Sequence, residues 1–116
     1  MVAISGYQTT YEIKQEGEGS PVKKGDTVTV HALGMVLETN KKFWSTKDQG
    51  QKPFTYQAGV GGVITGWDMG VLGMKVKEVR DITIPAKEGY GVGGFPAWGI
   101  PPNGTLCFTI EVLNIN

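Results

Sequence analysis

The sequence has little of what supports covalent, redox or metal chemistry. It holds one cysteine, Cys107, and one histidine, His31. A single cysteine excludes an internal disulfide and a cysteine-based metal cluster, and a lone histidine does not favour a metal site. Eleven basic residues balance eleven acidic ones. This even charge argues against proteins that bind nucleic acid or anionic membranes through their net charge.

Long apolar runs and signal segments are also missing. No run approaches the roughly 20 apolar residues that a membrane helix needs. Residues 1–6 lack the basic region and long apolar stretch of a signal peptide. We therefore expect a cytoplasmic protein that does not associate with membranes. No internal repeat or linker interrupts the sequence, so we expect a single domain over residues 1–116, with residues 1–6 as a disordered tail.

Glycine is the residue present in excess. The chain has 18 glycines among its 116 residues, about twice the usual share of roughly 7%, which predicts many tight turns and a β-rich protein. In the longest predicted strand, Val28, Val30 and Ala32 alternate with more polar residues. Composition and alternation predict strands at residues 7–14, 27–37, 42–45, 53–57, 79–85 and 105–115.

Residues 59–72 form the one plausible helix. Ile64, Trp67 and Val71 recur at i, i+3 and i+7 and so share one face. Five glycines lie in this range, and each costs about 1 kcal/mol relative to alanine inside a helix. Such a helix must be short and clamped by the strands around it. The order of the predicted elements, in which one short helix stands between two groups of strands, predicts an α+β fold with a mostly antiparallel sheet packed on the helix.

The candidates for polar chemistry are few and favour structural roles. His31 lies in mid-strand on the face opposite Val30. Cys107 lies between residues predicted to face inward, so its thiol is expected to point away from the core. The glycine-rich runs 59–62 and 91–94 lack the Lys-Ser/Thr pair of a phosphate loop. Acid–base, nucleophilic and phosphate-binding functions therefore have little support.

The remaining candidates for a functional site are large aromatic and branched apolar side chains. The irregular segment 87–104 contains Tyr90, Phe95, Trp98 and Ile100, which is too much apolar bulk for a disordered linker. We expect this segment to fold back and wall a pocket, because rings with a few polar tips are the usual form of a small-ligand site. The alternative is that the same rings form only the core of a β-rich protein.

Six stretches of the sequence, taken together and in order, form a specific pattern. The stretches are residues 25–31, 41–43, 52–54, 63–70, 84–91 and 100–106. The most specific is Val63-Ile64-Thr65-Gly66-Trp67, in combination with Tyr90-Gly91 and Ile100-Pro101-Pro102-Asn103. Together they resemble the FKBP family, the immunophilin-type peptidyl-prolyl cis-trans isomerases that bind tacrolimus and rapamycin. The resemblance runs from about Val22 to Leu113.

The resemblance implies a curved, mostly antiparallel sheet wrapped around one short helix, with a proline pocket between them. It implies that Trp67 is the pocket floor, and that the Ile64 N–H and the Tyr90 hydroxyl donate hydrogen bonds to bound carbonyl groups. The implied catalytic set is Trp67, Tyr90, Phe108, Phe43 and Ile64. The implied substrate- and drug-binding residues are Phe43, Phe54, Val63, Ile64, Trp67, Tyr90, Phe95, Ile100 and Phe108.

Three positions depart from the family pattern. Ala32 stands where the family usually has Tyr, Trp44 stands where it usually has Asp, and Phe95 stands where His is common. We expect Ala32 and Trp44 to line the pocket in place of two polar groups that contact the bound drug. One extra residue lies between Pro96 and Ile100, and it shifts the alignment of that loop by one position.

The resemblance further implies an isomerase that acts on proline-containing peptides and proteins without a cofactor. Drug-dependent complexes with calcineurin or the TOR kinase are implied by the resemblance alone. Prolyl isomerisation suits the residues present, because it requires no proton transfer or covalent intermediate. A rival from another class is a catalytically weak binding module for proline-containing peptides or macrolides on the same scaffold. Ala32 and Trp44 motivate this rival.

Overall fold

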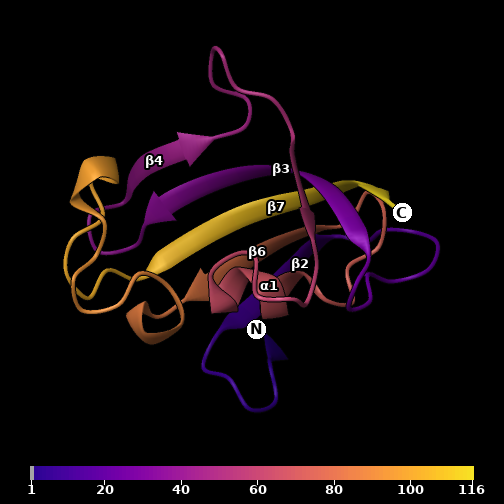
Figure 1. The fold of residues 1–116 in the computed structure, drawn as a ribbon, viewed down its shortest axis with the longest axis horizontal. Coiled ribbons are helices and arrows are strands. Elements are labelled where there is room, and N and C mark those ends of the chain that lie inside the picture. The colour runs from indigo at the N-terminus through magenta and orange to yellow at the C-terminus, as the bar shows by residue number, and fades with distance from the viewer. Residues whose placement is uncertain (1) are drawn as a thin grey trace.

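The computed structural model describes residues 2–116, and its strands form one curved antiparallel sheet (Figure 1). The seven strands are arranged in the order β1-β2-β6-β7-β3-β4, and β5 also pairs with β3. One α-helix, α1, spans Thr65–Val71, and short 3₁₀ turns span Ala86–Glu88 and Pro96–Trp98. The strands are β1 Val2–Ala3, β2 Thr10–Gln15, β3 Thr27–Val36, β4 Lys41–Ser45, β5 Phe54–Gln57, β6 Val79–Ile84 and β7 Leu106–Ile115. The predicted α+β class is therefore confirmed.

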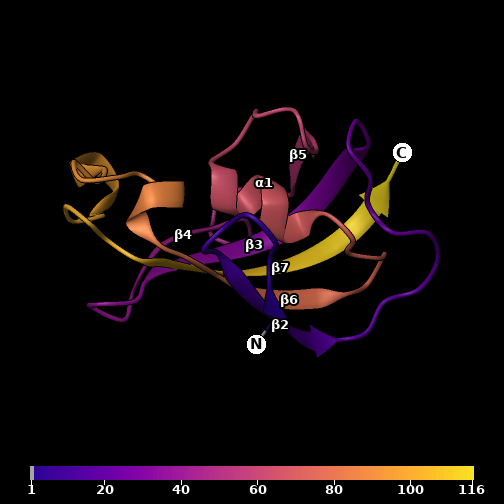
Figure 2. The same cartoon turned by 90° about the horizontal axis from the view of Figure 1, so that it is seen from below.

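The sheet curves around α1, which lies on its concave face (Figure 2). The alternation predicted for β3 is observed, since Val28, Val30 and Ala32 are buried while the residues between them are more exposed. Strand β7 shows the same pattern, with Phe108 and Ile110 buried. The apolar faces of the central strands and the helix together form one core.

Glycines allow α1 to lie directly against β6. A Cβ on Gly66 would collide with the side chains of Ile84 and Thr9, and a Cβ on Gly70 would lie 2.7 Å from Ile82 Cγ2. The helix therefore requires glycine at its sheet-facing positions, despite the low helix propensity of glycine. This requirement explains the unusual composition of the segment.

A buried ion pair holds the C-terminal end of α1. Arg80 Nε donates to Glu78 Oε2 at 2.5 Å, and both side chains are almost fully buried. Arg80 Nη1 also donates to the Gly70 carbonyl at 2.9 Å and to the Leu72 carbonyl at 3.2 Å. The guanidinium lies 3.8 Å from the centre of the Tyr11 ring. These contacts satisfy helix carbonyls that have no partner within the helix.

The structure corrects two boundaries. The helix predicted over residues 59–72 begins only at Thr65, because Gly59 and Gly61 have φ angles of +77° and +78° that no α-helix accepts. The prediction of a disordered tail at residues 1–6 does not match residues 2–3, which form β1 and pair with Thr10 and Tyr11. The free edge of β2 provides the backbone groups for this pairing. Residue 1 lies outside the described residues.

The helices found among residues 2–116 lack the combination of length and hydrophobicity that a membrane-spanning helix requires.

Candidate active site

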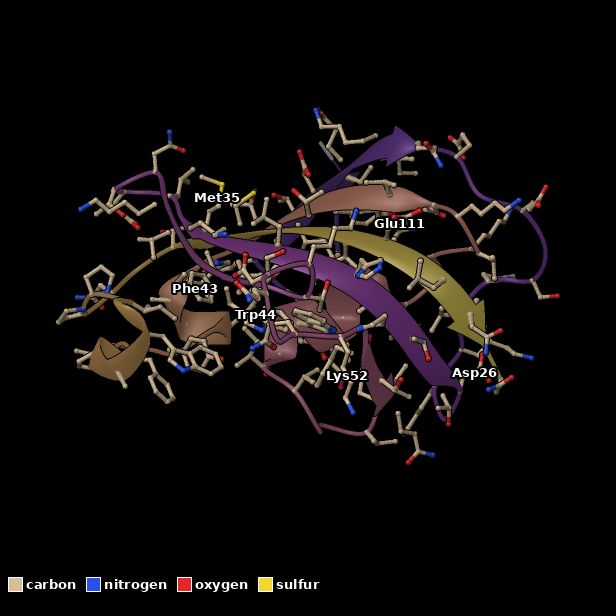
Figure 3. All side chains as sticks on the ribbon, turned by 90° about the horizontal axis from the view of Figure 1, so that it is seen from above. Asp26, Met35, Phe43, Trp44, Lys52 and Glu111 are labelled. Atoms are coloured by element: carbon tan, nitrogen blue, oxygen red, sulfur yellow. The ribbon has the colours of Figure 1, made fainter. Side chains whose placement is uncertain are left out.

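A bulge in β4 turns two consecutive aromatic residues toward α1. Trp44 pairs with Gly34, but the next pair joins Lys42 to Met35, so Phe43 is an extra residue in the ladder. Such a bulge lets neighbouring residues share one face of a sheet. A Cβ on Gly34 would lie 2.6 Å from Phe43 Cζ, so glycine at this position makes room for the ring. Figure 3 shows Phe43 and Trp44 side by side along this edge.

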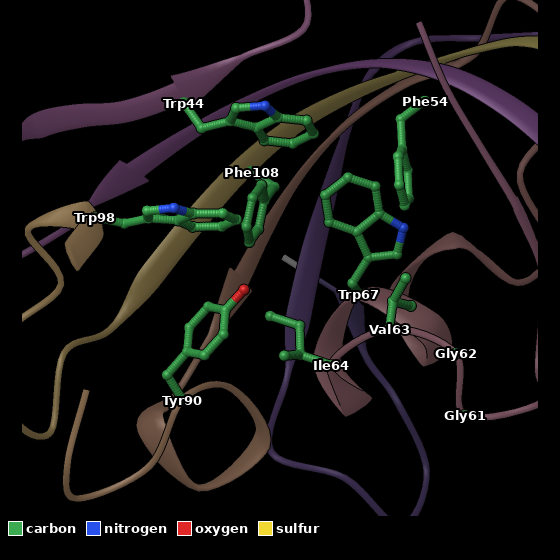
Figure 4. Close-up of a pocket in the computed structure, with 10 residues that line it drawn as sticks. All are labelled: Trp44, Phe54, Gly61, Gly62, Val63, Ile64, Trp67, Tyr90, Trp98 and Phe108. Atoms are coloured by element: carbon green, nitrogen blue, oxygen red, sulfur yellow. The ribbon is translucent and has the colours of Figure 1, made fainter. Parts of the chain in front are cut away.

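Between the sheet and the N-terminal end of α1 lies an open cavity of about 450 Å³ (Figure 4). Strands β4, β5 and β7, the loop before α1, and the long loop before β7 all contribute to its walls. None of the lining residues carries a charge. They are Trp44, Phe54, Gly61, Gly62, Val63, Ile64, Trp67, Tyr90, Trp98 and Phe108.

Trp67 forms the floor of this cavity and is held by rings on several sides. Its ring centre lies 4.8 Å from that of Phe108, 5.7 Å from that of Phe54 and 6.0 Å from that of Trp44. The Phe108 and Phe54 contacts are edge-to-face, an arrangement that aromatic quadrupoles favour. Only 4% of Trp67 is exposed. The floor is therefore a rigid apolar surface.

Tyr90 adds a polar group, its hydroxyl, to the otherwise apolar wall of the cavity. Its hydroxyl points into the cavity (Figure 4). Burial raises the pKa of Tyr90 above its ordinary value of 10.0, so the hydroxyl remains protonated and able to donate a hydrogen bond at neutral pH. Ile64 is the N-cap residue of α1, and no side chain caps that end of the helix. Ile64 itself lines the cavity, so the start of the helix lies beside it.

The aromatic wall continues into the long loop through a tight turn. Phe95 and Ile100 exchange two backbone hydrogen bonds, of 2.9 and 3.1 Å, and Gly99 ends the turn with a φ angle of +75°. This closed turn presents Trp98, whose ring centre lies 6.4 Å from that of Tyr90 and 6.3 Å from that of Phe43. Trp98 is therefore fixed at the mouth of the cavity.

The polar residues considered from the sequence lie outside the cavity. His31 Nδ1, in β3, forms a 2.8 Å hydrogen bond with Thr46 Oγ1 in the turn after β4, which agrees with a structural role. Cys107 is half-buried on the face opposite Phe108, and burial raises the pKa of its thiol. A thiol with a raised pKa is a poor nucleophile at neutral pH. No group of three potential metal ligands occurs among residues 2–116.

A family model for the FKBP-type peptidyl-prolyl cis-trans isomerases matches residues 18–113. The chain belongs to this family. A peptidyl-prolyl cis-trans isomerase FKBP12 from Arabidopsis thaliana is 50% identical over 106 residues, covering 90% of this chain and 95% of the relative. FK506-binding protein 1 from Debaryomyces hansenii is 50% identical over 109 residues, covering 93% of this chain and 95% of the relative. FKBP12 from Vicia faba is 51% identical over 104 residues, covering 88% of this chain and 93% of the relative.

The structure brings most of the residues implied by the FKBP resemblance to one cavity. Trp44 is among them, and its indole forms part of the wall. The implied residues that line the cavity are Phe54, Val63, Ile64, Trp67, Tyr90 and Phe108. The rings seen in the sequence therefore divide between site and core, since Tyr56 is buried in the core and does not line the cavity.

Four implied residues of the FKBP site do not line this cavity. Phe43 packs edge-on against the lining residue Phe108, with their ring centres 5.7 Å apart, but does not itself line the cavity. Ile100, near the end of the long loop, is buried in the core with 1% exposed. Phe95 stacks on the outer side of Trp98 at 5.0 Å, with 37% of its surface exposed. The prediction that Ala32 lines the pocket is corrected, because Ala32 is buried in the core and is not among the residues that line the cavity.

Sequence reasoning did not assign three lining residues, Trp98, Gly61 and Gly62, to the FKBP site. The sequence predicts that the loop containing Trp98 walls a pocket, and Trp98 does line the cavity, but the FKBP resemblance gives Trp98 no role because the extra residue there obscures the alignment. The signal that points to it is Phe95-Pro96-Ala97-Trp98-Gly99 itself. Proline at the first position of a 3₁₀ turn and glycine after it are typical of a short, fixed turn that displays its last side chain.

Proposed function

We propose that the cavity binds the proline ring and the adjoining amide of proline-containing peptides and proteins, and accelerates their cis–trans isomerisation. The observation that carries this proposal is the cavity of about 450 Å³, lined without a charged residue and floored by Trp67. A flat ring surface of this kind fits an apolar, cyclic side chain. Membership of the FKBP family supports the same activity.

The residues act by shape and desolvation. The uncatalysed barrier to peptide-bond rotation is about 18–20 kcal/mol, because amide resonance must be lost. The twisted amide has less charge separation than the planar one, so an apolar site favours it over the planar ground state. Trp67 and Phe108 form the apolar surface, and Phe43 supports Phe108 from behind. Catalysis in this scheme involves no proton transfer and no cofactor.

Two hydrogen-bond donors orient the substrate in this proposal. The Tyr90 hydroxyl points into the cavity and stays protonated, since burial raises its pKa. The backbone N–H of Ile64, at the uncapped start of α1, is the second donor. Together they would hold the carbonyl groups on either side of the proline while the amide rotates. Orientation of this kind lowers the entropic part of a barrier.

The same cavity is proposed to bind tacrolimus and rapamycin. The names of relatives such as FK506-binding protein 1 from Debaryomyces hansenii support this. Trp44 and Ala32 remove two polar drug contacts that the resemblance implies, so we expect weaker binding than in a site with the usual Asp and Tyr. Drug-dependent complexes with calcineurin or the TOR kinase, and a cytoplasmic location, remain part of the proposal and rest on the resemblance and the composition.

A second candidate function is a catalytically weak module that binds proline-containing peptides or macrolides. The observation that favours it is the indole of Trp44 inside the cavity wall, which narrows the space for a peptide. A coupled peptide assay combined with ligand titration separates the two functions. Acceleration of X-Pro isomerisation supports the enzyme, whereas ligand binding by a folded protein without acceleration supports the module.

A further inference from the structure

In the glycine-rich rim of the cavity, residues 59–62, Gly59 lies against Lys24, but no side chain packs on Gly61 and Gly62 to hold them in place. Gly61 and Gly62 line the cavity, and a Cβ added to either would meet no atom within 4 Å. Gly59 and Gly61 have positive φ angles, and glycine samples many backbone conformations when nothing restrains it. The position of this rim therefore depends on its hydrogen bonds.

A buried carboxylate provides those bonds. The Gly59 N–H donates to Asp68 Oδ1 at 2.6 Å, and the Gly61 N–H donates to Asp68 Oδ2 at 3.0 Å. Only 2% of Asp68 is exposed. Hydrogen bonds to a charged acceptor are stronger than neutral ones, and exclusion of water strengthens them further. Each carboxylate oxygen thus has its own partner in the rim.

Asp68 also connects the rim to the cavity floor. It follows Trp67 directly in α1, and its backbone N–H donates to the Ile64 carbonyl at 3.0 Å. The base of the rim is fixed separately, because the Ala58 N–H donates to the Asp26 carbonyl at 2.8 Å. A displacement of the Asp68 side chain would therefore move the rim without moving its base.

We propose that Asp68 is a positioning residue, which holds the rim at residues 59–62 in the conformation that binds the proline-containing substrate. This proposal rests on the proposed isomerase function of the cavity. Asp68 does not line the cavity itself, so its effect on substrate passes through Gly59 and Gly61. No chemistry is assigned to its carboxylate beyond accepting these two hydrogen bonds.

This role predicts a specific kinetic signature. If the untethered rim occupies the binding conformation about one-tenth of the time, apparent affinity for substrate falls about tenfold, because only that fraction binds. Saturating substrate selects the binding conformation, so kcat is retained. A residue that contributes only to global stability would leave KM unchanged while the protein remains folded.

The variant Asp68→Asn tests the proposal, because it keeps the shape of the side chain but has only one oxygen. A matched control is Glu78→Gln. Glu78 is also a buried carboxylate, and it accepts hydrogen bonds from the Lys75 N–H and from Arg80 Nε, which do not line the cavity. We expect Asp68→Asn to raise KM about tenfold with kcat retained, and Glu78→Gln to lower stability without changing KM.

Amide hydrogen exchange measured by NMR provides a second test that needs no substrate. In the wild-type protein, the Gly59 and Gly61 amides are expected to be protected, and in Asp68→Asn at least one of them should exchange faster while the amides of β3 and β7 remain protected. An unchanged KM in folded Asp68→Asn overturns the proposal, and so does a wild-type Gly61 amide that exchanges like an unstructured one. If the wild type has no isomerase activity, the proposed function fails, and Gly61 exchange alone decides whether Asp68 holds the rim.

Discussion

Trp44 closes one wall of the cavity, and replacing it with Asp should reopen that wall. The strand register places Trp44 opposite Gly34 and Phe54 opposite Val30, on the same edge of β3. The rings of Trp44 and Phe54 lie 6.2 Å apart. The indole therefore extends across the position of Ala32, which lies between Gly34 and Val30 on the same face. Trp44 therefore fills space that the short side chain of Ala32 leaves.

Two opposing effects of Trp44→Asp follow from this geometry. The substitution removes the ring contacts of Trp44 with Phe54 and Trp67, at 6.2 and 6.0 Å. Each such pair is worth about 0.5–1.5 kcal/mol, so the free energy of unfolding should fall by about 1–3 kcal/mol. If the cavity binds tacrolimus as proposed, a carboxylate at this position would supply the hydrogen bond to the drug that the FKBP resemblance implies, worth about 1.5–3 kcal/mol. Affinity should therefore increase about 10- to 150-fold.

Isothermal titration calorimetry with tacrolimus, together with denaturant unfolding, measures both effects. Trp44→Leu is the matched control, because it removes the indole without adding a hydrogen-bonding group and should not reproduce the full gain in affinity. Ala32→Tyr should destabilise the wild type, since its ring would meet the indole, and should be better tolerated in Trp44→Asp. An unchanged drug affinity in folded Trp44→Asp would refute the account of this wall.

The remaining predictions concern single side chains. Tyr90→Phe should lower kcat/KM about 5- to 10-fold, as expected for one lost hydrogen bond of about 1 kcal/mol or slightly more, and wild-type activity should persist to alkaline pH because burial raises the Tyr90 pKa. Burial alone would raise the pKa of Glu88, but hydrogen bonds from Thr9 and Gln8 outweigh burial and hold it below 4.5. Ionised Glu88 therefore stabilises the fold at pH values above its unfolded pKa, and this stabilisation should disappear as the pH falls through its lower native pKa. Glu88→Gln should make the free energy of unfolding depend less on pH in this acidic range.

Much of the fold could be predicted from the sequence, because the strands carry period-two patterns with one buried face. Residues of β3 and β7 alternate between buried and partly exposed along their length, and this period is visible in the printed residues. The helix was harder to bound. The face of the helix that packs inward follows from the spacing of Ile64, Trp67 and Val71. The residue at which the helix begins depends on the positive φ angles of Gly59 and Gly61 before it, which a hydrophobic pattern does not encode.

Patterns in the sequence locate those cavity residues that lie on a regular strand or on α1. They do not locate residues whose position depends on a bulge or an irregular turn. The bulge at Phe43 changes which side chains share a face, and no alternation pattern reveals it. Trp98 reaches the cavity through a turn closed by Phe95 and Ile100, a pairing that forms only in three dimensions. The FKBP resemblance implies that Ala32 lines the pocket in place of a Tyr, yet the Trp44 ring lines the cavity and Ala32 does not.

The most direct test of the central claim is the rate of cis–trans isomerisation of an X-Pro peptide in a coupled assay. We predict that the wild-type protein accelerates this rate, that tacrolimus competes for the same site, and that Phe108→Leu lowers kcat/KM while the protein stays folded. A folded protein that binds tacrolimus but leaves the isomerisation rate at its uncatalysed value would contradict the claim and would favour the binding module.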